Sequence, residues 1–310
     1  MDSAAQILRE QDGVASRRQL LDVELRQHDL ERMLRRRELT VVHPGVYVEH
    51  TGPLTWQQRA WAGVLFAWPA ALSHRSALRA SEGPGRRTRD DRLIEVAVDR
   101  QRHQTEPEGV RIRRTHGLHD RVQWNLGPPR IRYDDALIDV AADAPTDLDA
   151  VAALADACGA RRTTAARLLR TLDQRQRVRR RTWLESILAD VAQGTCSVLE
   201  HGYLDLVERP HGLPRGRRQA SHRHAGSTVF RDVDYDGLVV ELDGRLFHDS
   251  TRARDLDLER DLDAAVGGAE TIRLGYGQVF ERGCSTAAKV GLVLRRRGWP
   301  GRSQPCPSCP

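Results

Sequence analysis

Lysine is almost absent from this chain of 310 residues. Lys289 is the single lysine, and the other basic side chains are arginines. A mechanism that requires a catalytic lysine therefore has one candidate, close to the C-terminus. The formal net charge is +6 and the isoelectric point is near 9.4, which favours a polyanionic partner without establishing one.

Cysteine is also sparse. The last two cysteines form Cys306-Pro-Ser-Cys309 in a proline-rich tail. A structural zinc site generally needs four ligands, and the chain has no second Cys-x-x-Cys pair. The sequence therefore favours a disordered tail at residues 301–310 that carries two thiols over a metal site there. The five cysteines are Cys158, Cys196, Cys284, Cys306 and Cys309.

Long hydrophobic runs are missing as well. No apolar stretch approaches the roughly 20 residues of a membrane span, and the first residues lack the basic and apolar regions of a signal peptide. We therefore expect no membrane span and a cytoplasmic location. The length suits two or three domains, each large enough to bury its own core.

Residues 1–50 show a pattern of three short helices followed by two strands. Apolar residues at helical spacing predict the helices, with Ser16 as the N-cap of the second and Asp29 as the N-cap of the third. Strands are predicted at 39–42 and 45–48. Three helices and a closing hairpin are typical of the winged helix-turn-helix, whose last helix enters the DNA major groove.

The predicted third helix has an apolar stripe and an arginine-rich face. Leu30, Met33 and Leu34 form the stripe, and the opposite side carries four arginines. We interpret the arginines as DNA contacts; the alternative is a helical bundle with a solvated arginine face. The candidate nucleic-acid-binding residues here are Arg17, Arg18, Arg32, Arg35 and Arg36, beside Arg37 on the same face.

A motif in three parts spans this region: Gly13-Val-Ala-Ser-Arg-Arg-Gln-Leu20, Leu30-x-Arg-Met-Leu-Arg-Arg-Arg-Glu-Leu39 and His43-Pro-Gly-Val-Tyr47. It resembles the N-terminal domain of the type IV abortive-infection antitoxin family. The resemblance continues through Leu72-Ser-His-Arg-Ser-Ala-Leu78. It implies transcriptional autoregulation through the winged helix, and a cognate toxin-like protein as a partner.

Residues 51–181 predict a mixed α/β region without a catalytic constellation. Helices are expected at 56–68, 134–142 and 148–158, and paired strands at 93–98 and 110–113. We interpret His74 as a structural hydrogen-bonding residue. The segment Arg175–Arg181 holds five arginines in seven residues. Two interpretations of this segment stay open: it contacts phosphate, or it is a solvated face on or between helices.

An acidic hairpin stands out in residues 182–300. Asp236-Gly237 is a strong signal for a two-residue turn, which places Tyr235 opposite Leu238 and Asp234 opposite Val239. The alternation of side chains then assigns one face to the core and gathers four carboxylates around Val239 on the other face. The core face is Val233, Tyr235, Leu238, Val240 and Leu242; the carboxylates are Asp232, Asp234, Glu241 and Asp243.

Clustered like charges destabilise a sheet unless something compensates them. Carboxylate oxygens are the ligands that Mg²⁺ and Mn²⁺ prefer, so the acidic face predicts a hard divalent cation. Asp234 and Glu241 are the preferred ligands, and Asp243 extends or orients the site. Glu200 is a further candidate ligand from a preceding helix, unless it is an ordinary exposed glutamate. The alternative for the whole face is a solvated, unbalanced acidic edge.

Several residues of this region follow one pattern in chain order. They are Glu200, Leu204, Gly212-Leu-Pro214, Val233-Asp234, Val240-Glu-Leu-Asp-Gly244, His248 and Arg260-Asp261. The pattern resembles an uncharacterised domain family related to the very-short-patch mismatch repair endonucleases, within the PD-(D/E)XK superfamily. The resemblance implies that Asp234 and Glu241 bind the metal, that Glu200 is the helix acid, and that the metal serves phosphodiester hydrolysis.

The chain departs from the superfamily pattern at one position. Asp243 stands where the pattern has lysine, two residues after the second acid. The mismatch-repair relatives use histidine instead, which makes His248 the candidate for a general base or phosphate contact; the alternative is a histidine that caps the next element. Arg252 and Arg260, on a helix expected at 251–266, are candidates for phosphate binding or for surface ion pairs.

Together these patterns predict a mixed α/β protein: a winged helix-turn-helix at 1–50, an antitoxin-like middle region at 51–181, and a restriction-endonuclease-like domain at 182–300. The expected function is DNA binding with Mg²⁺- or Mn²⁺-dependent cleavage or nicking of DNA. The alternative is a transcriptional regulator whose nuclease fold is inactive. The missing lysine favours this alternative, whereas the retained set of acids favours catalysis.

Overall fold

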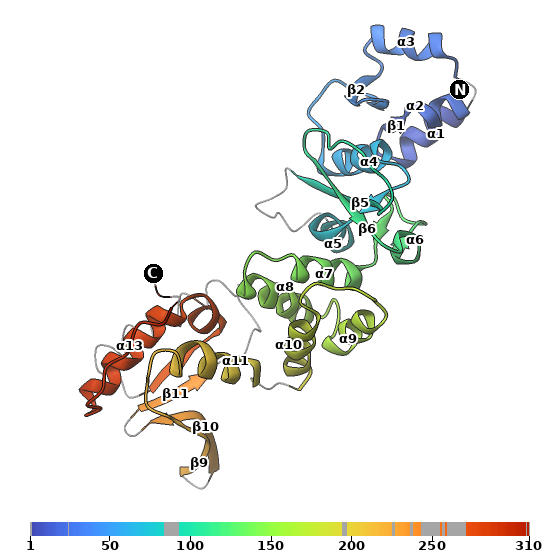
Figure 1. The fold of residues 1–310 in the computed structure, drawn as a ribbon. Coiled ribbons are helices and arrows are strands. Elements are labelled where there is room, and N and C mark those ends of the chain that lie inside the picture. The colour runs from blue at the N-terminus through green and yellow to red at the C-terminus, as the bar shows by residue number, and fades with distance from the viewer. Residues whose placement is uncertain are drawn as a thin grey trace. The chain divides into compact units, whose positions relative to one another are not determined.

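The computed structural model describes residues 2–23, 25–83, 93–193, 197–224, 227–235, 238–242, 255, 258, 271–307 and 309. The chain divides into two compact units, Met1–Asp139 and Val140–Pro310. Each unit combines helices with a mixed or antiparallel sheet (Figure 1), which confirms the mixed α/β class. None of the described helices is long and apolar enough to cross a membrane.

The first unit begins with three helices and a three-stranded antiparallel sheet in the order β1-β3-β2. The predicted helices and closing hairpin are present, and β1, which pairs with β3, was not predicted. Leu20, Leu30 and Tyr47 form the core between helices and sheet. The elements are α1 (Asp2–Glu10), β1 (Val14–Ser16), α2 (Arg17–Asp22), α3 (Gln27–Arg35), β2 (Thr40–His43) and β3 (Val46–Val48).

Local capping explains where the second and third helices begin. The Ser16 hydroxyl accepts a hydrogen bond from the Gln19 amide at 3.2 Å, so the predicted N-cap is confirmed. The prediction for Asp29 is wrong by three positions, because Arg26 is the N-cap of α3. Asp29 lies in the first turn, and its carboxylate accepts from the Arg26 amide at 3.1 Å. That hydrogen bond is the main cause of a lowered pKa for Asp29.

The rest of the first unit is a five-stranded sheet in the order β6-β5-β4-β8-β7. The expected strands 93–98 and 110–113 are β5 and β6, which pair in parallel. His74 is buried at the first position of α5. The elements are α4 (Trp56–Phe66), β4 (Ala71–Leu72), α5 (His74–Glu82), β5 (Ile94–Asp99), β6 (Val110–Thr115), α6 (Leu118–Arg121), β7 (Val122–Gln123), β8 (Arg130–Ile131) and α7 (Tyr133–Ala142).

Helix α4 lies between the two sheets of this unit (Figure 1). Trp61 and Leu65 pack against the valines of β1 and β3, whereas Ala60 and Val64 belong to the core around β5. The buried residues of α4 thus lie on two faces of the helix, one against each sheet. Because both sheets share α4, the compact unit extends from the N-terminus to residue 139, past the boundary at residue 50 suggested by the motifs.

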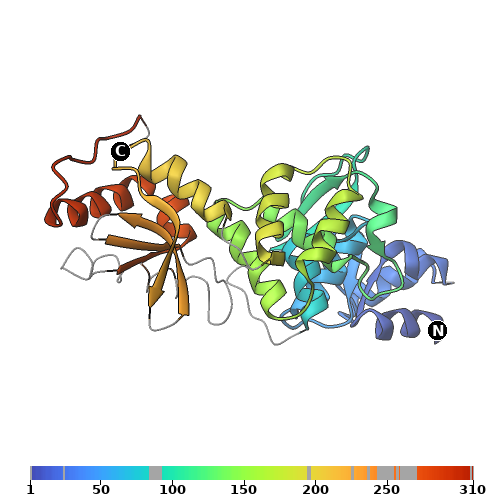
Figure 2. The ribbon, with the colours of Figure 1, turned by 90° about the horizontal axis from the view of Figure 1, so that it is seen from below.

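The second unit carries a four-stranded sheet in the order β12-β11-β10-β9. Strands β9, β10 and β11 are antiparallel neighbours, and β12 runs parallel to β11. Helices α11 and α13 lie together on one side of the strands (Figure 2). The elements are α8 (Asp147–Gly159), α9 (Ala165–Asp173), α10 (Arg181–Gln193), α11 (Ser197–Gly202), the π-helical η1 (Tyr203–Glu208), β9 (Arg217–His224), β10 (Ser227–Tyr235), β11 (Leu238–Leu242), β12 (Thr271–Leu274), the π-helical η2 (Gly277–Glu281) and α13 (Gly283–Arg296).

The hairpin register agrees with the sequence prediction. Tyr235 is opposite Leu238 and Asp234 is opposite Val239. The five residues of the predicted core face are all buried, at 3% exposure or less. The turn residues Asp236 and Gly237 lie outside the described residues.

The expectation of a disordered tail is wrong for the described residues after 300. The Gln304 amide donates a hydrogen bond to the His211 carbonyl at 2.8 Å, and Ser303 lies against Gly291 of α13. The tail therefore returns along α13 from its C-terminal end toward its N-terminal end. Local composition alone indicated a free tail because the surfaces that hold it come from distant segments.

Gln58 connects α4 to the N-terminal sheet and provides a test of their shared packing. Its side-chain amide donates to the Asp12 carbonyl at 3.0 Å and its oxygen accepts from the Thr55 amide at 3.0 Å, in a side chain of 9% exposure. We expect Gln58→Leu to lower the free energy of unfolding by about 1–3 kcal/mol, because buried partners lose their hydrogen bonds. Urea denaturation followed by circular dichroism measures this loss. The control is Gln57→Leu, expected to stay within about 0.5 kcal/mol; an equal loss in both variants would contradict the assignment.

Candidate functional site

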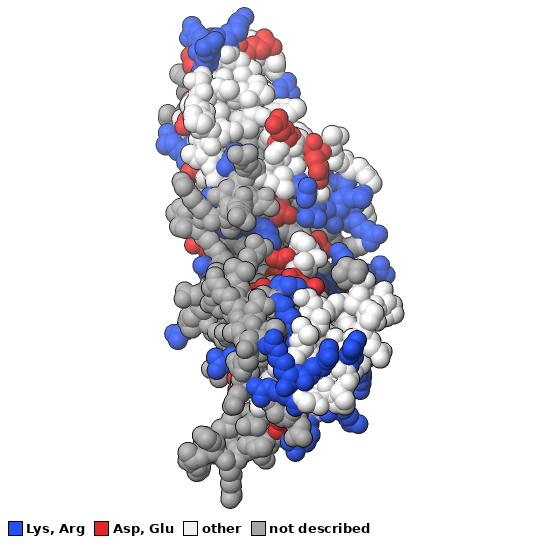
Figure 3. Space-filling model, turned by 90° about the vertical axis from the view of Figure 1, so that its left-hand side faces the viewer, with Lys and Arg blue, Asp and Glu red and all other residues white. Residues whose placement is uncertain are grey.

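Helix α3 presents the predicted arginine face to solvent. Leu30 is buried, and Met33 and Leu34 pack against the same core. Arg32, Arg35, Arg36 and Arg37 are exposed. Figure 3 shows basic side chains gathered at the top of the view, where Figure 1 places α3. Arg32 and Arg35 are therefore exposed on α3 while the apolar stripe is packed, as the helical spacing predicted. The prediction is wrong for Arg36 and Arg37, because α3 ends at Arg35 and these two residues follow it.

Some of these arginines have partners on their own element. Arg32 forms an ion pair with Asp29 at 2.9 Å, and Arg36 lies 3.8 Å from Glu38. On α2 and beside it, Arg17 donates to Gln27 and Arg18 pairs with Asp22 at 3.8 Å. The arginines in these contacts are exposed, and contacts of exposed charged side chains exchange for other partners at little cost. The face can therefore turn its guanidinium groups toward a polyanion.

The arginine-rich segment 175–181 joins α9 to α10. The Arg180 guanidinium pairs with Asp147 and lies 4.0 Å from the centre of the Trp183 ring. Arg181 pairs with Glu185 at 3.2 Å. These contacts of Arg180 and Arg181 favour the structural interpretation of this segment over a phosphate contact.

The acidic hairpin is bordered by arginines of the two neighbouring strands. Arg217 of β9 lies directly opposite Asp234, with a guanidinium nitrogen 3.4 Å from the carboxylate. Arg273 of β12 lies opposite Glu241 at 3.1 Å. Asp232 accepts a hydrogen bond from the Leu242 amide at 2.6 Å. The charges of Asp234 and Glu241 are therefore balanced across the sheet, which the hairpin considered by itself did not show.

An open cleft of about 480 Å³ lies beside Asp234. Arg215 and Arg217 line it from the start of β9, and Arg297 and Trp299 line it from the end of α13. The Asp234 side chain is 6% exposed, whereas that of Arg217 is 70% exposed. A mostly buried carboxylate is thus paired with an exposed guanidinium group. Three arginines around one acid give this cleft the charge that a phosphate needs.

Asp234 and Glu241 fit a hard divalent cation in donor type and placement. Register puts them on one face of the hairpin as diagonal neighbours, which places their Cβ atoms about 7 Å apart. Mg²⁺ is commonly held by one or two carboxylates, with waters and substrate phosphates completing its shell. Glu200, the third predicted ligand, is part-exposed on α11. Among the described residues, these three carboxylates do not form a closed group of possible metal ligands.

Four predicted site residues lie outside the described residues, so their positions are left open. They are Asp243, His248, Arg252 and Arg260.

A buried carboxylate that sequence reasoning missed lies beneath the hairpin. Glu208, at the end of η1, is 2% exposed. It accepts hydrogen bonds from the Tyr235 hydroxyl at 2.7 Å, from Arg218 at 2.8 Å and from the Gly216 amide at 3.3 Å. A Cβ at Gly216 would lie 2.3 Å from the Val233 side chain, so this close approach requires glycine. The sequence signal that could have identified Glu208 is an acidic residue at the end of an apolar helix, directly before the helix break at residues 211–214.

The network extends to a second buried tyrosine. The hydroxyls of Tyr203 and Tyr235 lie 3.1 Å apart. Burial is the main cause that raises the pKa of both phenols above their usual range, so both stay neutral and donate hydrogen bonds. This arrangement fixes the inner face of the hairpin, and Asp234 is held on the outer face as a result.

No protein-family model matches this chain, and the search of curated proteins found no match. The resemblances to the antitoxin and endonuclease families rest on the motifs quoted above.

The tyrosine network provides a test of how the hairpin is held. We expect Tyr235→Phe to lower the free energy of unfolding of the second unit by about 1–3 kcal/mol, because Glu208 loses a buried donor. Tyr203→Phe should cost less, since its hydroxyl contacts Tyr235 and not the carboxylate. The unfolded-state phenol ionises near pH 10 and the folded phenol does not, so stability falls above about pH 10 and falls less steeply in Tyr235→Phe. Chemical denaturation at several pH values measures both effects, and equal losses in the two variants would argue against the network.

Proposed function

We propose that this chain binds duplex DNA through α3. The observation that carries the proposal is the row of exposed arginines that begins on α3, the second helix of the α2–α3 pair, and continues directly after its end, before the β2–β3 hairpin. In a helix-turn-helix the second helix lies in the major groove and the hairpin contacts the flanking backbone. Arginine binds phosphates and guanine edges with two parallel hydrogen bonds, and the net charge of +6 adds long-range attraction.

We further propose that the second unit cleaves or nicks DNA with Mg²⁺ or Mn²⁺ at the cleft beside Asp234. The arginine-lined cleft and the diagonal carboxylates support this. Asp234 and Glu241 would hold the cation, which activates water and offsets charge in phosphodiester hydrolysis. Arg215, Arg217 and Arg297 orient the phosphate. By resemblance Glu200 and His248 complete the site. Asp243 extends or orients it, and Arg252 and Arg260 are further phosphate contacts.

A second candidate function is DNA binding without cleavage, as in a transcriptional regulator. The ion pairs of Asp234 with Arg217 and of Glu241 with Arg273 favour it, because each acid already has a counter-charge without a metal. The antitoxin resemblance belongs to this alternative and adds a toxin-like protein as a partner. Both candidates place the protein in the cytoplasm, with its DNA.

DNA binding through α3 predicts a change in salt dependence. We expect the double variant Arg35→Ala, Arg36→Ala to bind duplex DNA more weakly. Its slope of log affinity against log salt should be smaller by about 1.8, because each lost phosphate contact contributes about 0.9. Fluorescence anisotropy over a salt series measures both. The charge-matched control is Arg167→Ala, Arg170→Ala on α9, expected to keep the wild-type slope; equal changes in both doubles would refute a specific role for α3.

Cleavage is tested with supercoiled plasmid and labelled single-stranded DNA in Mg²⁺, Mn²⁺ or EDTA. We expect metal-dependent cutting that falls to background in Asp234→Asn and in Glu241→Gln, since the amides cannot replace both charged ligands. The control is Asp205→Asn, an exposed acid paired with Arg209. A wild-type protein that shifts these DNAs in a gel and leaves them intact would favour the second candidate function, DNA binding without cleavage.

A further inference from the structure

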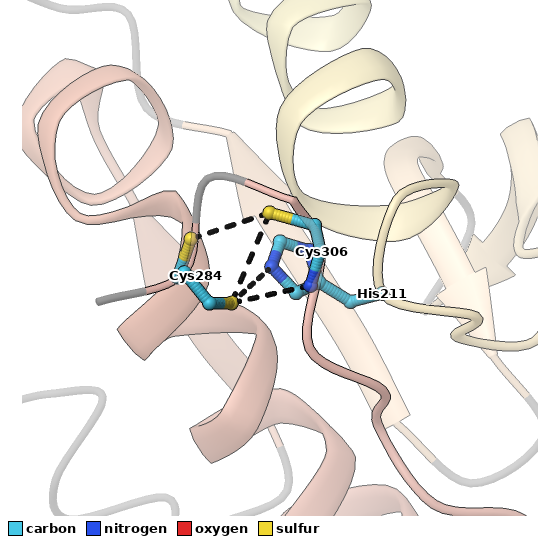
Figure 4. A group of neighbouring side chains, drawn as sticks. His211, Cys284 and Cys306 are labelled. Carbon is cyan, nitrogen blue, oxygen red and sulfur yellow. Dashed lines mark hydrogen bonds between the residues drawn. The ribbon is translucent and has the colours of Figure 1, made fainter.

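Four side chains that can bind a metal meet at the C-terminal end of the chain. His211 follows η1, Cys284 lies in the first turn of α13, and Cys306 and Cys309 belong to the tail. Their ligand atoms all lie within 4.8 Å of one another. Figure 4 shows the His211 ring and the sulfurs of Cys284 and Cys306 pointing toward a common centre. The cluster thus unites three separate segments of the second unit.

The distances in the cluster match those of a tetrahedral zinc site. The sulfur of Cys306 lies 3.7 Å from that of Cys284 and 3.8 Å from that of Cys309. With zinc–sulfur bonds of about 2.3 Å, tetrahedral geometry puts two sulfurs about 3.8 Å apart. Cys309 lies 3.7 Å from His211 Nε2, and the corresponding sulfur–nitrogen separation is about 3.6 Å. Disulfide sulfurs lie about 2.0 Å apart, so these thiols are not bonded to each other.

The surroundings of His211 prepare its ring for a metal. The residue is 2% exposed, and its Nδ1 lies 3.0 Å from the Val207 carbonyl. A carbonyl only accepts, so Nδ1 carries the proton and Nε2 presents its lone pair to the sulfurs. A histidine held through its other nitrogen by a backbone carbonyl is the usual second contact of a metal-binding imidazole. The Cys306 amide likewise donates to the Cys309 sulfur at 3.2 Å.

We propose that His211, Cys284, Cys306 and Cys309 bind one Zn²⁺ ion in a closed structural site. Three soft sulfurs and one imidazole select zinc over the hard cations that carboxylates bind. Four protein ligands leave no open position for a substrate, so the site stabilises the fold and does not catalyse. Binding converts the thiols to thiolates, and their protons pass to solvent. This site is separate from the acidic hairpin and does not depend on the proposed nuclease activity.

The zinc ion fastens the tail along α13. Between the end of α13 and Cys306, the chain passes Arg297 and Trp299, which line the cleft beside Asp234. The ion therefore fixes the far end of the segment that forms one wall of that cleft. Removal of zinc with a chelator should free the tail, and trypsin should then cut after the exposed Arg302 faster than in the loaded protein. Equal cutting rates with and without zinc would refute the fastening role.

Metal analysis of the full chain, purified without a histidine tag, tests the proposal. We expect about one zinc per chain in the wild type and a loss of at least about tenfold in Cys306→Ser, Cys309→Ser. Cys158→Ser is the matched control, because Cys158 lies on α8 outside the cluster and should leave the zinc content unchanged. A wild-type protein without zinc, or a double variant with wild-type zinc, would overturn the proposal.

Measurements on the wild type keep the test valid if the double variant does not fold. An organomercurial that titrates thiols should release zinc to a colorimetric indicator as the cluster cysteines react. Replacement of zinc by Co²⁺ should give the intense visible bands and thiolate charge-transfer absorption of a tetrahedral site. Release of no zinc, or a weak spectrum typical of six oxygen ligands, would overturn the proposal.

Discussion

The register of the β10–β11 hairpin is the constraint on which the second unit depends. Side chains alternate along a strand, so pairing Tyr235 with Leu238 decides the content of both faces at once. On one face Tyr235 reaches Glu208, and Leu238, Val240 and Leu242 enter the core. On the other face Asp234 and Glu241 become diagonal neighbours. A slip of one residue would bury the acids and expose the core, so the buried Glu208 network and the outer carboxylates are two results of one pairing.

Arginine has two roles in this protein, and they lead to different expectations. On α3 the guanidinium groups are exposed and paired only with partners on the same surface, where a polyanion can replace them at little cost. Around the hairpin, Arg217 and Arg273 neutralise the acids across neighbouring strands. The same ion pairs serve either proposed function. They hold the carboxylates in place for a metal, or they substitute for the metal permanently.

The cluster of His211, Cys284, Cys306 and Cys309 would hold the tail against the rest of the second unit. The tail has no secondary structure between 300 and 306, and a single backbone hydrogen bond ties Gln304 to His211. A structural zinc ion contributes folding free energy directly, since its ligands meet only in the folded state. It therefore suits a segment that hydrophobic burial alone does not hold.

Local pattern was enough to predict the elements whose signals are local. The Asp236-Gly237 turn and the alternation around it predicted the hairpin register and its core face, and Ser16 predicted the start of α2. The cap of α3 and the strand β1 were missed, because Arg26 is an atypical cap and a three-residue strand carries little periodicity. The acids of the candidate site were visible in sequence for the same reason as the hairpin: they belong to one short segment.

The sequence by itself thus determined the short-range facts: helices, hairpin, the arginine face of α3 and the acidic face of β10–β11. Tertiary structure alone decided which residues from distant parts of the chain contact these local elements. Arg217 and Arg273 reach the acids from separate strands, Glu208 reaches Tyr235 from a preceding helix, and Cys309 meets His211 across 98 residues of chain. A Cys-x-x-Cys pair shows two ligands at most. The other two come from segments brought together by sheet pairing and helix packing, whose contacts no local spacing encodes.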